Sequence, residues 1–135
     1  MKKNIHIGLK VLLSLILLMP VLGTLGIFPE PTADLYNTAE AFDFIVTLNS
    51  AWYIMYMMAA VHIIALIALW TRREALAALL ILPITLNIMG FHAFLDGGLL
   101  TGGAVMGNVL FLLNAYFLNK NCGTVKLLME QKRIG

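Results

Sequence analysis

The stretch PITLNIMGFHAFLD, residues 83–96, places an amide, an imidazole and a carboxylate inside a chain that is otherwise strongly apolar. On a helix, Asp96 lies one turn after His92, close enough to fix which ring nitrogen carries the proton. His92, Asp96 and Asn87 are therefore candidates for binding a ligand. Asn87 lies on nearly the opposite face. Because it is deep in the apolar run, we expect it to bond to another helix or to the carbonyl freed by Pro83.

Further polar side chains occur at other depths of the predicted helices. His62 lies near the middle of its apolar stretch, on one face with Met55 and Met58, and ionisable residues inside a membrane are candidates for function. Asn108 and Asn114 add two amides to the last long stretch. Together these groups predict either a polar path for a ligand or hydrogen bonds that fix helix register, and the sequence leaves both open.

The composition indicates that membrane helices must position these groups. Hydrophobic residues make up 61% of the chain and charged residues 12%, whereas soluble proteins average about 45–50% and 25%. Four stretches approach the roughly 20 apolar residues that a crossing needs, at about 5–28, 51–70, 75–95 and 103–119. The sequence therefore predicts an all-α integral membrane four-helix bundle, with residues 1–135 as a single domain.

Small and kinking residues indicate how the helices pack. Gly103 and Gly107 form a small-xxx-small pair on the fourth stretch, which favours close helix contact, and Pro83 joins them as a packing residue. The first stretch lacks a small-x-small cleavage site, so we expect it to remain as a span and not to be removed as a signal peptide.

The longest connection, residues 29–50, contains no basic residue. Read as a helix over about 33–48, it places Leu35, Ala39, Phe42 and Val46 on one face. We expect an interfacial helix in the first outer loop, lying on the bundle end or acting as a lid over a cavity. Its acids Glu40 and Asp43 are expected to be solvated and not to bind a metal.

Charge placement predicts the topology. All nine Lys and Arg residues precede or open the first span, lie between the second and third, or follow the fourth, whereas five of the seven acids occupy the other two loops. Because basic residues collect on the cytoplasmic side, we expect both termini to be cytoplasmic and residues 120–135 to form a cytoplasmic tail. This pattern indicates a multi-pass membrane protein with the lipid bilayer as its partner, and the family resemblance described next implies the bacterial cytoplasmic membrane. It gives no reason to expect nucleic-acid binding.

The segment ALLILPITLNIMGFHAFLD resembles the third-helix signature of the DoxX-like family of small bacterial membrane proteins. The specific part is Pro83-Ile84, Asn87-Ile88 and Phe91-His92 followed by Phe94-Leu95-Asp96, and the remaining segments match mainly in hydropathy. The resemblance implies a four-helix membrane protein of a family associated with quinone-linked oxidation of sulfur compounds and with thiol and oxidant homeostasis. Asn87, His92 and Asp96 carry over as motif positions, without an established catalytic role.

Three function classes follow. The first is a quinone- or redox-linked accessory component, in which His62 or His92 and Asn87 bind the quinone carbonyls. The single cysteine, Cys122, rules out an internal dithiol, so whether the chain is an enzyme is left open. The second is a small transporter or carrier of a cation or small molecule, and the third is a structural partner that assembles with a membrane or redox protein or with itself.

No metal site is predicted, and quinone is the only cofactor suggested. The sequence also offers two other groupings of residues. Met55, Met58, His62 and Met106 offer the thioether and imidazole ligands that suit Cu(I). A haem between His62 and His92 is disfavoured because the two histidines differ in depth by about 13 Å of helix rise.

Overall fold

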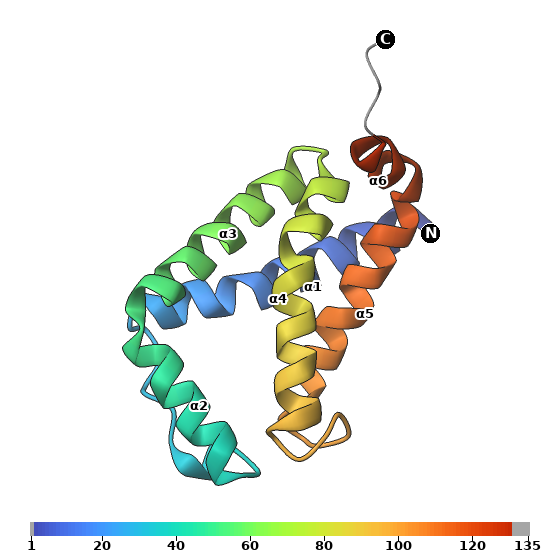
Figure 1. The fold of residues 1–135 in the computed structure, drawn as a ribbon. Coiled ribbons are helices and arrows are strands. Elements are labelled where there is room, and N and C mark those ends of the chain that lie inside the picture. The colour runs from blue at the N-terminus through green and yellow to red at the C-terminus, as the bar shows by residue number, and fades with distance from the viewer. Residues whose placement is uncertain (1, 131–135) are drawn as a thin grey trace.

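The computed structural model describes residues 2–130, and the regular elements within that range are all helical, as the sequence predicts (Figure 1). In chain order they are α1 (Lys2–Thr24), the 3₁₀ turn η1 (Ala33–Leu35), α2 (Ala39–Ser50), α3 (Trp52–Trp70), α4 (Glu74–Phe94), α5 (Val105–Lys120) and α6 (Cys122–Met129).

Three helices, α1, α3 and α4, are long and apolar enough to cross a membrane, judged by length and composition. Helix α5 has 16 residues, or about 24 Å at 1.5 Å per residue, which is less than the roughly 30 Å of a bilayer's hydrocarbon core. It begins at Val105 and not at the predicted residue 103, because residues 99–104 form turns and bends. A fourth crossing would therefore need the residues that flank α5.

Helix α1 ends at Thr24, although apolar residues continue to position 28. Gly26 adopts a φ of +73°. This backbone conformation is strained for residues that carry a β-carbon, but glycine adopts it readily. The N–H of Ile27 then donates to the carbonyl oxygen of Leu22 at 3.1 Å. This is the Schellman arrangement in which a glycine terminates a helix.

The predicted helix over residues 33–48 is instead a short 3₁₀ turn followed by α2. The side-chain oxygen of Thr38 accepts the N–H of Ala41 at 3.1 Å and so supplies the N-cap from which α2 begins. The tail also contains structure that the sequence reading missed, because residues 122–129 form α6.

Helix α3 packs against both α1 and α4, and α4 packs in turn against α5 (Figure 1). In Figure 1, α1 crosses behind α4 at a wide angle. All four helices contribute side chains to one apolar core, which includes Leu13, Leu17, Leu69, Ile81 and Phe117.

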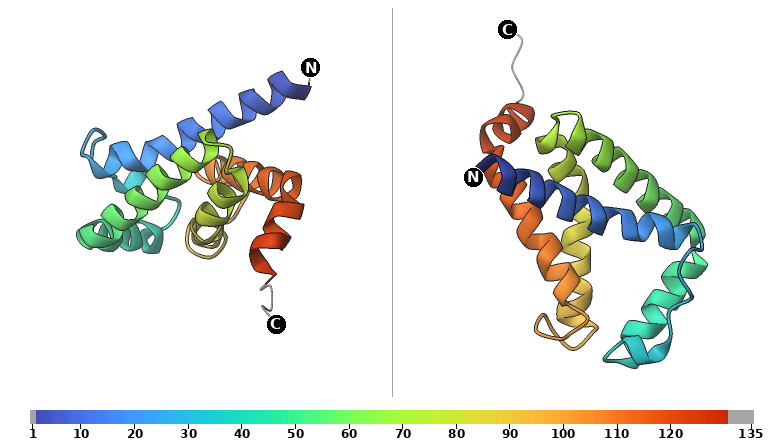
Figure 2. Two further views of the ribbon diagram at one scale, coloured as in Figure 1. Left: turned by 90° about the horizontal axis from the view of Figure 1, so that it is seen from above. Right: turned by 180° about the vertical axis from the view of Figure 1, so that it is seen from behind.

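Helices α3 and α4 meet at the turn of residues 71–73 and diverge away from it, and α2 lies on the open side (Figures 1 and 2). We call the end that carries this turn, the start of α1 and the end of α5 the basic end. We call the opposite end, with the loops before α2 and after α4, the acidic end. The site described next lies at the acidic end.

Candidate functional site

Four residues from two distant segments form a hydrogen-bonded group, here called the acidic-end cluster: Asn37, Thr38, His92 and Asp96. His92 Nδ1 lies 2.9 Å from Asp96 Oδ2, and the backbone N–H of Asn37 donates to Asp96 Oδ1 at 2.8 Å. The side-chain amide of Asn37 donates to the backbone oxygen of Asp96 at 3.1 Å. The hydroxyl of Thr38 donates to the backbone oxygen of Leu95. The structure thus confirms the predicted pairing of His92 and Asp96 and adds Asn37 and Thr38.

The contacts fix the tautomer of His92. A carboxylate oxygen only accepts hydrogen bonds, so Nδ1 must carry the proton that lies between His92 and Asp96. Nε2 makes no hydrogen bond within residues 2–130 and presents a lone pair when the ring is neutral. This pair of groups has the arrangement of a base oriented by a carboxylate.

The environment keeps Asp96 ionised. Its side chain is only 1% exposed, and burial by itself raises a carboxyl pKa. The hydrogen bonds from Asn37 and His92 outweigh burial and hold the pKa of Asp96 below its usual value. The pKa of the nearby Tyr36 hydroxyl is raised, because burial and the negative charge of Asp96 both disfavour its ionised form.

The His92 ring is enclosed by glycines near the start of α5. A β-carbon built on Gly103 would lie 3.2 Å from Asp96 Oδ2 and 3.8 Å from His92 Cε1, and one built on Gly107 would lie 3.4 Å from His92 Cδ2. The His92 side chain is accordingly only 12% exposed. Gly107 therefore permits close contact of α5 with α4, as predicted, whereas Gly103 lies in the turn before α5 and accommodates the cluster itself.

Aromatic rings connect the cluster to α2. Phe91 packs edge-on against His92 with 5.0 Å between ring centroids, and its ring centroid lies 5.7 Å from that of Phe44 on α2 and 6.2 Å from that of Tyr36. Phe44 is 39% exposed. Phe91 therefore joins α4 to α2 on the side facing away from α5.

Asn87 does not make the bond that the sequence led us to expect. Its side chain is exposed, and neither a neighbouring helix nor a freed carbonyl receives its amide within the described residues. The reason is the direction of its face: it points away from the α4 side that buries Ile81 and Thr85. Pro83, on the same stripe as Asn87, is also exposed.

Two of the other predicted polar residues lie in the core instead. His62 is 1% exposed, and its Nδ1 donates to the backbone oxygen of Met58 at 2.7 Å. Asn114, also 1% exposed, donates to the Ala78 carbonyl at 3.3 Å and to the Thr85 hydroxyl at 3.4 Å. This is the predicted cross-helix bond, although its Oδ1 is buried without a partner.

Asn108, the last predicted candidate, donates to the backbone oxygen of Leu99 at 2.7 Å and so ties the α4–α5 loop to α5. A cavity of about 340 Å³ at the acidic ends of α1 and α3 is lined by Glu30, Trp52 and Tyr56 among others, but by none of the predicted polar candidates. Within residues 2–130, no three His, Cys, Asp or Glu side chains gather into a metal-binding group.

A second polar group, which the sequence reading missed, lies at the basic end. This basic-end cluster consists of His6 and Lys10 on α1, Glu74 on α4 and Lys120 on α5. Glu74 Oε1 lies 2.8 Å from His6 Nε2 and 3.1 Å from Lys10 Nζ, and Oε2 lies 3.7 Å from Lys120 Nζ. The available signals were the four-residue spacing of His6 and Lys10 and the isolation of Glu74 among basic residues.

No protein-family model, curated protein or solved structure matches this chain. The DoxX-like resemblance accordingly remains an interpretation of the residues 83–96 signature and its surroundings.

Proposed function

We propose that this protein is a multi-pass bacterial inner-membrane protein of DoxX-like type that binds a quinone as an accessory component of a redox system. Three membrane-length helices support the membrane setting, and the one-sided placement of the nine basic residues supports cytoplasmic termini. In this proposal α5 and its flanking residues make the fourth crossing, and α2 lies at the outer interface.

The observation that carries the ligand proposal is the exposed amide of Asn87 on α4. An amide on an apolar membrane face is costly unless a partner pairs with it. Binding sites for small molecules are typically apolar with a few polar groups that orient the ligand. Asn87 has this character, because it can donate to a carbonyl oxygen while its surroundings remain apolar.

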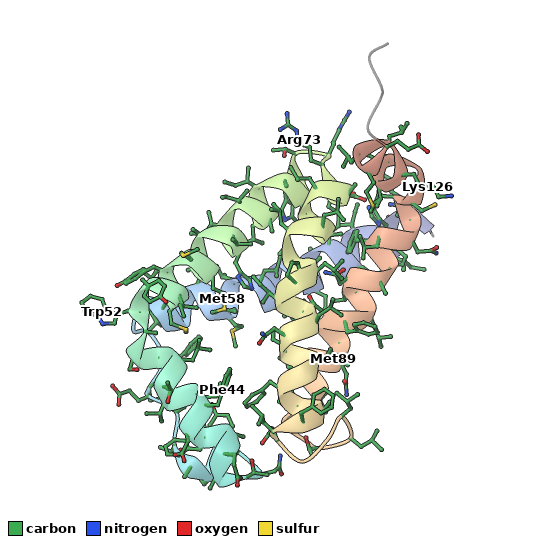
Figure 3. All side chains as sticks on the ribbon, in the orientation of Figure 1. Phe44, Trp52, Met58, Arg73, Met89 and Lys126 are labelled. Atoms are coloured by element: carbon green, nitrogen blue, oxygen red, sulfur yellow. The ribbon has the colours of Figure 1, made fainter. Side chains whose placement is uncertain are left out.

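Aromatic and thioether side chains on α4 and on the helices opposite it suit a flat ring. Phe91 lies one turn further along the same face of α4, and Phe44 packs next to it from α2. Met58 on α3 and Asn87 on α4 lie at about the same distance in sequence from the α3–α4 turn. Figure 3 shows Met58 and Phe44 on the two helices that lie opposite α4. A quinone ring can thus bond to Asn87 while aromatic and thioether groups contact its faces.

In this role the predicted histidines act indirectly. His62 is fully buried, and Nε2 of His92 is directed toward α5, so neither is placed to bond to a ligand beside Asn87. His92 instead holds Asp96 and packs against Phe91. The described residues offer binding and orientation, and electron transfer falls to a partner protein.

Quinone retention tests the proposal. The parent and Asn87→Leu are purified in mild detergent, and the quinone per protein is measured by mass spectrometry of the extract. One lost hydrogen bond is worth about 1 kcal/mol, so we expect about five-fold less quinone in Asn87→Leu. The control is Leu86→Ala, the neighbouring exposed position, which should retain quinone like the parent. Equal quinone in the parent and Asn87→Leu, or none in the parent above the lipid background, would contradict the proposal.

A further inference from the structure

The basic-end cluster contains more hydrogen-bond donors than its acceptors can satisfy. His6 Nε2 faces a carboxylate oxygen of Glu74 at 2.8 Å, so this nitrogen carries a proton. In a neutral ring, Nδ1 then has a single lone pair. The Tyr116 hydroxyl lies 3.3 Å from Nδ1, and the Lys120 ammonium lies 2.9 Å from Nδ1 and 2.7 Å from Nε2. Because Nε2 already carries a proton, Tyr116 and Lys120 both compete for the lone pair of Nδ1.

Lys120 therefore keeps donors for another ligand. Its ammonium has three N–H groups. One can bond to His6, and the 3.7 Å separation from Glu74 Oε2 is too long for a second hydrogen bond. The Lys120 side chain is 40% exposed, which leaves its remaining N–H groups open to the surroundings.

A groove lies beside these donors. It has a volume of about 510 Å³ and is lined by Lys3, Ile5, His6, Tyr116 and Lys120. Lysines stand along it from both α1 and α5, and the nearby Glu74 carboxylate is already engaged by His6 and Lys10. The groove thus presents uncompensated positive charge together with a hydroxyl group.

We propose that this groove binds the phosphate headgroup of an anionic phospholipid. The phosphate would accept hydrogen bonds from Lys3, Lys120 and Tyr116, which are donors suited to phosphate oxygens. Ile5, which is 55% exposed, and the apolar face of α1 beyond it provide contact for the acyl chains. The proposal requires the membrane placement of α1 but not the quinone role, so either can fail without the other.

A lipid fits these features better than a soluble phosphate does. The groove lies at the end of an apolar helix that is long enough to cross a membrane, which is where a bilayer presents its headgroups. Basic residues near the cytoplasmic surface attract anionic lipids.

Native mass spectrometry of the delipidated full chain provides the test. The protein is mixed with phosphatidylglycerol and phosphatidylcholine of identical acyl chains, and the preference for the anionic lipid is measured. We expect Lys120→Gln to reduce this preference about five-fold, in line with about 1 kcal/mol for the loss of a hydrogen bond to the phosphate. Lys126→Gln is the matched control, because it removes one exposed charge from α6 at the same end (Figure 3), and it should change the preference by less than about two-fold.

Two further measurements make the result decisive. Lys3→Gln changes an exposed residue in the first turn of α1, so it tests the groove without disturbing Glu74, and it should lower the preference in the same direction. Glycerol phosphate and inorganic phosphate should fail to displace the lipid. Equal losses in Lys120→Gln and Lys126→Gln, an unchanged preference in Lys3→Gln, or displacement by inorganic phosphate would each overturn the proposal.

Discussion

Asn37 and Asp96 are 59 positions apart in the chain, yet two hydrogen bonds of 2.8 and 3.1 Å join them. Asn37 comes just before α2, and Asp96 comes just after α4. Because the other end of α2 leads directly into α3, this contact links the acidic ends of α3 and α4 through α2. The buried carboxylate of Asp96 therefore connects the acidic ends of α3 and α4, although these helices diverge from their shared turn.

The hydrogen bonds of Asp96 should stabilise the folded protein. Asp96→Asn removes the charge while keeping an acceptor for the Asn37 N–H, so the charge-assisted part of the cluster is lost. We expect a loss of about 1–3 kcal/mol in the free energy of unfolding, measured as a lower melting temperature in detergent. The control is Asp43→Asn, an exposed acid on α2, which should melt like the parent. Equal melting of both variants would show that Asp96 does not stabilise the acidic end.

Lowering the pH should remove the stabilisation that the ionised Asp96 side chain provides. The pKa of Asp96 in the folded state lies below its ordinary value of 3.8, so the folded protein binds this proton less readily than the unfolded chain does. Its stabilisation is complete above the unfolded pKa and is lost as the pH falls through the folded pKa. We expect the melting temperatures of the parent and Asp96→Asn to approach each other as the pH is lowered from about 5 toward about 1. A constant difference across that range would contradict this assignment.

Hydropathy located the long helices well, because apolar length alone decides which segments can cross a membrane. The ends of the predicted stretches 51–70 and 75–95 lie within one residue of those of α3 and α4. The end of α1 was misplaced because Gly26 terminates the helix inside an apolar run, where hydropathy gives no signal.

The candidate site was only partly predictable, for reasons of distance along the chain. The His92–Asp96 contact is local and follows from helical spacing. The two contacts with Asn37 join positions far apart in the chain, so helical spacing does not predict them. One of them uses a backbone N–H, which any residue except proline offers. For Asn87 the hydropathy pattern predicts the depth of the side chain but not the direction in which it points, because that direction depends on how α3, α4 and α5 pack.

Gly107 should tolerate substitution poorly. A β-carbon there would lie 2.9 Å from Cγ2 of Ile88, a methyl group on a β-branched side chain that cannot swing away freely. We expect Gly107→Ala to cost about 1–3 kcal/mol in stability by overpacking. Gly90→Ala is the control, because a β-carbon at this helical glycine meets nothing within 4 Å. Gly90→Ala should be neutral or slightly stabilising, and thermal melting of both variants checks the order.

Asn114 should be replaceable by leucine at little cost. Its two hydrogen bonds are long, at 3.3 and 3.4 Å, and its Oδ1 is buried without a partner. Replacing it with an apolar residue of similar size removes that unsatisfied group along with the weak bonds. We expect Asn114→Leu to change the free energy of unfolding by less than about 1 kcal/mol. The reverse change nearby, Leu113→Asn, places a new amide at a buried position and should destabilise clearly. A large loss in Asn114→Leu would mean that the core uses this amide.

The energetic link between His92 and Asp96 can be isolated with a double-mutant cycle. His92→Leu leaves the buried carboxylate without the donor that lies 2.9 Å away, whereas His92→Gln keeps a donor of similar reach. We therefore expect His92→Leu to lower the melting temperature more than His92→Gln does. Once Asp96→Asn has removed the charge, His92→Leu should cost less, since no unpaired carboxylate remains, and the coupling should be about 1–3 kcal/mol. Additive losses in the double variant would mean that the two side chains stabilise the protein independently, and that packing of the ring against Phe91 and Gly107 is the whole contribution of His92.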